Sequence, residues 1–210
     1  NDITEAKRLE EALRKSQKEL AVRNRIAEIL LSMPQEEIYS PVLQVILEAL
    51  ESKRGFFGYI DDHGNLVCPS LSTDVWDQCD VPGKSIVFPR EKWGGLWGRT
   101  LAEKRPGYLN SGLHVPAGHI HLERALAMPI VFGGELIGLV VVADKETDYG
   151  EDDARRLETI CGHLAAILHA RRQRDEQYRA RKQAEHALHR LQRQLGDDQS
   201  FAGIVGRHPK

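Results

Sequence analysis

Aromatic residues and cysteine are scarce in this chain of 210 residues, and neither sign of charge prevails. Aromatic side chains make up 6% of the sequence, whereas hydrophobic residues make up 41%, which is enough for one core. The 29 Lys and Arg residues nearly balance the 31 Asp and Glu residues, which gives a formal net charge of -2. Such a balance predicts no general attraction to nucleic acid or to an anionic membrane surface.

Long apolar runs are also missing. No run approaches the ~20 residues that a membrane-spanning helix needs, and the first residues are polar, unlike those of a signal peptide. We therefore expect a cytoplasmic chain. Cys68, Cys79 and Cys161 lie far apart and show no C-x-x-C spacing, so neither a disulfide framework nor a structural zinc site is expected.

The sequence patterns of common catalytic sites are absent as well. The chain has no G-x-S-x-G, no H-E-x-x-H, no Walker A motif and no phosphoacceptor pattern of a histidine kinase. The pairs Gly94-Gly95 and Gly133-Gly134 are typical of turns and not of phosphate-binding loops. We expect that the chain is not an enzyme.

A helical pattern occupies residues 3–33. Pro34 cannot continue the helical hydrogen bonds and is predicted to end this helix. The heptad positions form an apolar but interrupted stripe, which is typical of a two-stranded coiled coil of modest strength. They are Leu9, Leu13, Ser16, Leu20, Arg23, Ala27 and Leu30.

A second long helix is predicted to begin after Gly150, because the acidic residues at 151–153 suit the N-terminal end of a helix dipole. Its first apolar stripe gives way to a charged stretch at 171–182, where interspersed acidic residues favour a solvated coiled-coil face over a DNA-binding patch. An apolar stripe then resumes in a shifted heptad phase at Ala184, Leu188, Leu191 and Leu195. Gly196 is predicted to end the helix. The stripes at the two ends together predict a parallel homodimer.

Between these helices the sequence predicts a β-rich core. Residues 55–60 and 66–68 are expected to be strands joined by a turn at 61–65. Short helices are expected at 72–79 and at 96–104, the second ended by Pro106. The clearest pattern is a hairpin in which Gly133-Gly134 joins apolar strands at 125–132 and 135–143.

This hairpin and the residues after it resemble the end of a GAF domain. The run P-I-V-F-G-G-E-L-I-G-L-V at 129–140 follows the family pattern P-[IL]-x-x-x-G-x-x-x-G-x-[LV]. D-K at 144–145, Tyr149 and D-D at 152–153 are similar to the N-K…F-x-x-D motif that follows it. Asp144 replaces the usual Asn and Tyr149 the usual Phe, which weakens an assignment of cyclic-nucleotide binding.

The resemblance implies an α+β fold with a six-stranded antiparallel sheet, helices on one face, and a ligand cavity on the other face roofed by residues 70–124. This roof is rich in Trp, Cys and His, and their rings bury surface while offering a polar edge to a small molecule. Trp in a small domain is also a common core residue, so a structural role stays open. The predicted ligand contacts are Phe56, Trp76, Cys79, Trp93, Trp97, His114, His119, His121, Arg124 and Met128.

Several of these residues allow more than one interpretation. His119 and His121 would point the same way in an extended segment, where they could contact a ligand or form structural hydrogen bonds. Arg124 could hold an anionic group, or pair near Glu123 at the surface. The histidines with Cys79 offer donors suited to zinc or iron, and a lone His can hold haem, but their spacing is not diagnostic. No metal site is therefore expected, and the cofactor is unknown.

The two ends of the chain resemble junctions of a multidomain signalling protein. D-I-T-E at 2–5 resembles the exit of a PAS domain, and F-A-G-I-V-G-R-H-P at 201–209 resembles the entry to the AAA+ ATPase domain of sigma-54-dependent transcription activators. The expected organisation is a signalling helix at 1–33, a GAF sensory domain at 34–170, a coiled-coil linker at 171–196 and the start of an effector at 197–210.

The expected function follows from this organisation. The GAF domain would bind a small molecule or sense redox state, and the signal would pass through the exit helix to the ATPase. The alternatives are the sensor domain of a histidine kinase and a dimerisation module without a ligand.

Overall fold

The computed structural model describes residues 2–71, 86–115 and 119–202. By its internal contacts the chain divides into two units, Asn1–Leu168 and His169–Lys210, and each is described by itself. Helix α5, Glu151–Ala202, begins in the first unit and supplies the described part of the second. None of the described helices contains a stretch that is long and apolar enough to cross a lipid bilayer.

Six antiparallel strands form one sheet in the order β3-β2-β1-β6-β5-β4. This confirms the predicted fold. The strands are β1, Arg54–Ile60; β2, Leu66–Leu71; β3, Val87–Phe88; β4, Gly107–Leu109; β5, Ala125–Phe132; and β6, Glu135–Ala143.

The hairpin of β5 and β6 forms as predicted. The strands pair from Ala125 with Ala143 to Phe132 with Glu135. Gly133 and Gly134 turn between them with φ values of 58° and 84°. Both lie in the left-handed region, which glycine adopts at little steric cost, and this is why the turn can be read from the sequence.

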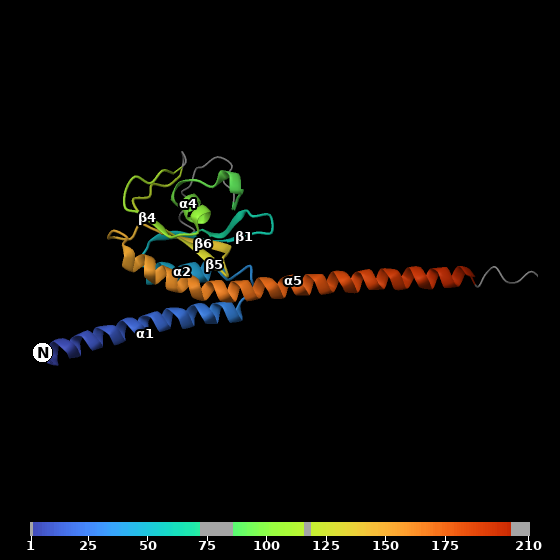
Figure 1. Ribbon diagram of the computed structural model, residues 1–210, viewed down its shortest axis with the longest axis horizontal. Coiled ribbons are helices and arrows are strands. Elements are labelled where there is room, and N and C mark those ends of the chain that lie inside the picture. Colours follow the sequence, from blue (N-terminus) through green and yellow to red (C-terminus); the bar gives the residue numbers. More distant parts are fainter. Residues whose placement is uncertain (1, 72–85, 116–118, 203–210) are drawn as a thin grey trace, which may run out of the picture. The chain divides into compact units, whose positions relative to one another are not determined.

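Helices cover one face of the sheet, which we call the helical face (Figure 1). Helix α2, Tyr39–Ala49, packs there together with the end of helix α1, Asp2–Ser32, and the beginning of α5. Side chains alternate along a strand, so every second strand residue points toward these helices. The strand residues buried on this face include Phe57, Leu126, Met128, Ile130, Val140 and Val142.

The opposite face carries helix α4, Gly95–Glu103, and the loops around it, and we call it the loop-covered face (Figure 1). Its buried cluster includes Leu66, Cys68, Leu101, Ala127, Leu139 and Val141. Helix α4 ends at Glu103, and its C-cap residue Lys104 has a left-handed φ of 53°, shortly before Pro106. The helix predicted at 96–104 is therefore confirmed, whereas the one predicted at 72–79 lies outside the described residues.

Helix α1 ends at Ser32, close to the stop predicted at Pro34. The predicted heptad stripe is wrong at Leu30, which is fully buried in the core, while its neighbour Leu31 is 81% exposed. The last turns of α1 direct Ile26 and Leu30 into their own domain, so the exposed stripe follows a different set of positions.

Helix α5 begins at Glu151, as the acidic residues there predicted. The Asp153 carboxylate accepts a hydrogen bond from the backbone N–H of Gly150 at 3.1 Å. The helix passes through Gly196 and reaches Ala202, so the end predicted at Gly196 is wrong. An interior glycine costs a helix roughly 0.5–1 kcal/mol, which is too little to end it.

Candidate functional site

Three of the predicted ligand contacts lie together on the loop-covered face. Phe56, Trp93 and Trp97 are half-buried and pack against the buried cluster of that face. Trp97 meets Phe88 edge-on, with ring centroids 5.7 Å apart. Trp76 and Cys79 were predicted to join them but lie outside the described residues.

The indole of Trp93 is held by protein contacts. Its Nε1–H donates a hydrogen bond to the backbone oxygen of Phe88 at 3.1 Å. The guanidinium of Arg90 lies 5.8 Å from the ring centroid, within the range of a cation–π contact. Trp93 therefore links the loop before α4 to β3.

The three predicted histidines do not form a cluster with shared hydrogen bonds. His114 is exposed and its Nδ1 lies 3.1 Å from the Gly112 oxygen. His119 is half-buried with Nδ1 2.8 Å from the Ile120 oxygen, and His121 is exposed. Residues 119–124 are not a strand, so the alternation expected for His119 and His121 does not apply. Across the described ranges, no group of three or more His, Cys, Asp and Glu side chains is placed to hold a metal ion.

Met128 does not belong with the other predicted contacts. It is 2% exposed and lies in the core of the helical face. Met128 pairs with Val140 of β6, which faces the same helices. The alternation of side chains along β5 therefore turns Met128 away from the loop-covered face, and its prediction as a ligand contact is corrected.

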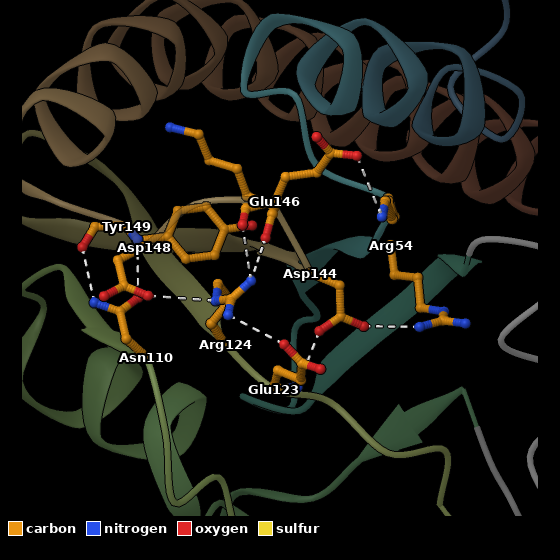
Figure 2. A network of polar contacts seen from close by, with 10 residues as sticks. Arg54, Asn110, Glu123, Arg124, Asp144, Glu146, Asp148 and Tyr149 are labelled. Carbon is orange, nitrogen blue, oxygen red and sulfur yellow. Dashed lines mark hydrogen bonds and ion pairs between the residues drawn. The ribbon is translucent and has the colours of Figure 1, made fainter.

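Arg124 is surrounded by protein acceptors at the start of β5 (Figure 2). One of its terminal nitrogens donates to the backbone oxygens of Lys145 at 2.7 Å and Glu146 at 3.4 Å. The other pairs with the Glu123 carboxylate at 3.1 Å, and Nε lies 3.5 Å from a carboxylate oxygen of Asp148. Of the two predicted roles, the structure places Arg124 in surface pairing, where it ties β5 to the loop between β6 and α5.

Asp144, which stands where the family has Asn, is held on both of its oxygens. Arg54 of β1 donates to Oδ2 at 2.7 Å, and the backbone N–H of Glu123 donates to Oδ1 at 3.0 Å. The two paired side chains are 28% and 13% exposed. Asp144 has a φ of 58°, a left-handed conformation that Asp and Asn tolerate better than most residues. The negative charge that Asp144 carries, and that an Asn at this position would lack, is therefore paired with Arg54.

Tyr149, which stands where the family has Phe, uses its hydroxyl as well. The hydroxyl is 2.8 Å from the Ser52 hydroxyl, and the side chain is almost fully buried. Burial raises the pKa of Tyr149 to about 12. Asn110, just after β4, bonds the backbone of Tyr149 twice: its Oδ1 accepts from the N–H at 2.8 Å, and its Nδ2 donates to the oxygen at 3.0 Å.

These contacts form one polar network that reaches the first turn of α5. Lys145 ion-pairs with Asp153 at 2.7 Å, and both side chains are less than 20% exposed. Asp153 in turn accepts from the Gly150 N–H. The sequence patterns did not point to three residues of this network, which are Asn110, Arg54 and Ser52. Each of them bonds a residue far away in the chain, and such a bond leaves no local pattern.

The two described free cysteines are buried on opposite sides of the sheet. Cys68 of β2 is 1% exposed on the loop-covered face, and Cys161 of α5 is 3% exposed on the helical face. Burial raises the pKa of Cys68 to about 12 and also raises that of Cys161. Both side chains are therefore thiols near neutral pH and not reactive thiolates.

A groove of about 690 Å³ lies on the helical face, between α1, α2 and the first turns of α5. Arg25 of α1 and Glu48 of α2, both at its edge, form an ion pair at 2.5 Å. None of the predicted ligand contacts that lie within the described ranges lines this groove.

The chain belongs to the GAF domain family, whose model matches residues 32–169. One similar protein, the methyl sulfide methyltransferase-associated sensor of Methanosarcina acetivorans, is 26% identical over 195 residues. That match covers 89% of this chain and 18% of the sensor, so the chain spans less than a fifth of that protein.

Solved structures share the fold. The GAF domain of a phosphoenolpyruvate-protein phosphotransferase from Coxiella burnetii superposes with a TM-score of 0.58 at 22% identity, over 76% of this chain and 98% of that domain. Free methionine-R-sulfoxide reductase from Neisseria meningitidis, solved in complex with its substrate, gives a TM-score of 0.54 at 17% identity, over 74% of this chain and 93% of the reductase chain.

Proposed function

We propose that this chain is the sensory segment of a signalling protein. Its GAF domain binds a small molecule on the loop-covered face, and helix α5 carries the resulting change toward a C-terminal effector. The observation that supports this best is the polar network at the start of α5. Asn110 and Arg124 lie in segments that border the loop-covered face, and both bond the loop between β6 and α5. Lys145 of that loop pairs with Asp153 in the first turn of α5.

The identity of the effector is also part of the proposal. The resemblance of residues 201–209 to the entry of a sigma-54 activator ATPase favours that effector. A histidine kinase is the alternative, and a ligand-free dimerisation module is the third possibility. The similarity to a sensor that is much longer than this chain supports a sensory segment within a larger protein.

A non-catalytic role is proposed because the chain lacks the catalytic patterns sought in its sequence. The fold alone does not decide this, since one structural neighbour is a reductase. The raised pKa values of Cys68 and Cys161 disfavour either described cysteine as a nucleophile at neutral pH. For the same reason neither described cysteine supports redox state as the signal, and we propose a small molecule instead. We also propose that the segment acts in the cytoplasm as a homodimer, through its N- and C-terminal helices.

Mass spectrometry of compounds released from the purified, denatured chain tests ligand binding. A small molecule should be released from the wild-type chain and from Tyr108→Ala, a control on an exposed aromatic residue of β4. It should be lost from Trp97→Ala combined with His119→Ala. A Soret band in the absorbance spectrum would identify the compound as haem. Trp97 and His119 are structural if the wild-type chain retains no compound, the double variant loses thermal stability, and the full-length protein with the same two substitutions signals normally.

Transmission through α5 is tested by two deletions in the full-length protein. Removing the seven residues 172–178 keeps the heptad phase of the apolar stripe, whereas removing 172–175 rotates it by roughly a ninth of a turn. The seven-residue deletion should keep regulation of the effector, and the four-residue deletion should lock the effector on or off. Equal behaviour of the two would make the linker a simple tether.

A further inference from the structure

The first half of helix α1 is exposed on all sides. Every residue from 5 to 21 is exposed, although the helix is continuous from Asp2 to Ser32. A helical segment of this length is only marginally stable alone in water, because nucleation is costly and most helical stability comes from packing. We therefore expect this half of α1 to have a packing partner.

The exposed leucines of α1 follow an eleven-residue spacing. Leu9, Leu20 and Leu31 are eleven residues apart and are 66%, 51% and 81% exposed. Leu13, which is 60% exposed, and the half-buried Ala27 lie beside them. Because each residue turns an α-helix by ~100°, these five side chains form one stripe within an arc of about 40°.

This stripe is distinct from the face that α1 turns toward its own domain. Ile26 and Leu30 are buried in the core, and Val22, Ile29 and Met33 pack against it. The centres of the two faces are roughly 130° apart around the helix axis. Leu20 also lines the groove between α1, α2 and α5, but it is 51% exposed, so the domain leaves the leucine stripe accessible to a second partner.

Polar residues along the stripe suit a second copy of the same helix. Asn24 lies eleven residues after Leu13, so it holds the same position in the next repeat. In a parallel pair the two Asn24 amides face each other across the twofold axis and can hydrogen-bond, as buried Asn residues do in coiled coils.

The charges beside the stripe are also complementary in this arrangement. Arg23 and Glu28 flank opposite sides of it and are five residues apart, the spacing at which flanking charges of parallel helices meet. Glu5 and Glu10 have the same spacing with like charges, which weakens the pairing toward the N-terminal end. The complementary pair lies near the domain, where α1 is also fixed by its core contacts.

We propose that the α1 stripe is the seam of a parallel homodimer, packed against the same stripe of a second copy. The seam consists of Leu9, Leu13, Leu20, Asn24, Ala27 and Leu31. An eleven-residue repeat gives a right-handed or nearly straight helix pair, in contrast to the left-handed coil of the heptad expected from the sequence. This inference rests on the proposed homodimer and adds which residues of the two α1 helices face each other.

Disulfide formation tests this register. Asn24→Cys and Leu31→Cys, each in the 210-residue chain with Cys79→Ser, place one thiol on the seam. Lys18→Cys is the matched control, because it is exposed on the same helix but roughly 160° from Leu20. After oxidation with copper phenanthroline, non-reducing electrophoresis should show about tenfold more covalent dimer for the seam variants than for the control and the Cys79→Ser background.

Sedimentation at micromolar concentration separates the seam from the homodimer itself. A chain that sediments as a dimer while Lys18→Cys cross-links as well as Asn24→Cys overturns the seam and leaves the homodimer standing. A chain that sediments as a monomer overturns both. Independently, Leu20→Asp with Leu31→Asp should raise the dimer dissociation constant by about tenfold or more, whereas Lys7→Asp with Lys18→Asp should not. Equal effects of the two pairs also overturn the seam.

Discussion

Phe56 and Phe57 are neighbours on β1, yet they belong to different environments. Phe57 is fully buried on the helical face, with its ring centroid 4.9 Å from that of Tyr39. Phe56 is half-buried on the loop-covered face beside α4 and its loops. We therefore expect substitutions on the helical face to cost more stability than substitutions on the loop-covered face and its polar border.

Alanine substitution of the two phenylalanines gives the largest expected effect. Phe57→Ala should reduce the free energy of unfolding by about 3–5 kcal/mol, because it empties a fully buried site. Phe56→Ala should cost about half as much, because less of its surface is removed from water. Urea denaturation of both variants measures the difference. Equal losses would mean that the two faces contribute alike to stability.

The second effect concerns the polar border, at Asp144. Asp144→Ala should cost about 1–3 kcal/mol, because the Arg54 guanidinium and the Glu123 N–H each lose their hydrogen bond to this carboxylate. Asp144→Asn, the residue usual in the family, should cost less, because it keeps an acceptor and tolerates the left-handed backbone. Urea denaturation measures both variants. A double-mutant cycle with Arg54→Ala isolates the pair, and an interaction energy near zero would show that the contact does not stabilise the domain.

A smaller effect is expected at Tyr149. Tyr149→Phe removes the hydrogen bond to Ser52 and should cost about 0.5–1.5 kcal/mol at neutral pH. Because the pKa of Tyr149 is raised to about 12 from 10.0, the unfolded chain releases this proton first. The stability that this group contributes is therefore full below pH 10 and is lost as the pH rises from 10 to about 12.

The pH dependence of unfolding checks this assignment. The free energy of unfolding of Tyr149→Phe should fall less steeply than that of the wild-type chain over this window. Parallel curves for the two proteins would contradict the raised pKa.

The last expected effect concerns thiol chemistry and leaves stability unchanged. In a Cys79→Ser variant, Cys68 and Cys161 should react with Ellman's reagent at pH 8 roughly a thousandfold more slowly than a free thiol, since little thiolate is present. Rapid labelling of the folded chain would contradict the buried thiols and would favour redox state as the signal.

Local patterns predicted the fold well, and long-range contacts limited the prediction of the site. The β5–β6 hairpin was predictable because Gly133 and Gly134 mark the turn and apolar strands flank it. The bonds from Asn110 to Tyr149 and from Arg54 to Asp144 join residues 39 and 90 positions apart, which no local pattern records. Met128 was misassigned because composition near a predicted pocket does not reveal which way a strand residue points.

If α1 pairs through the proposed stripe, the spacing of Leu9, Leu20 and Leu31 sets a rule for joining foreign input domains to this segment. If α1 is extended at its N-terminal end, added helix in multiples of eleven residues keeps the new apolar positions in line with the stripe, whereas multiples of seven turn them progressively away from it. A series of chimeric receptors should therefore respond to their inputs with a periodicity of eleven residues in linker length.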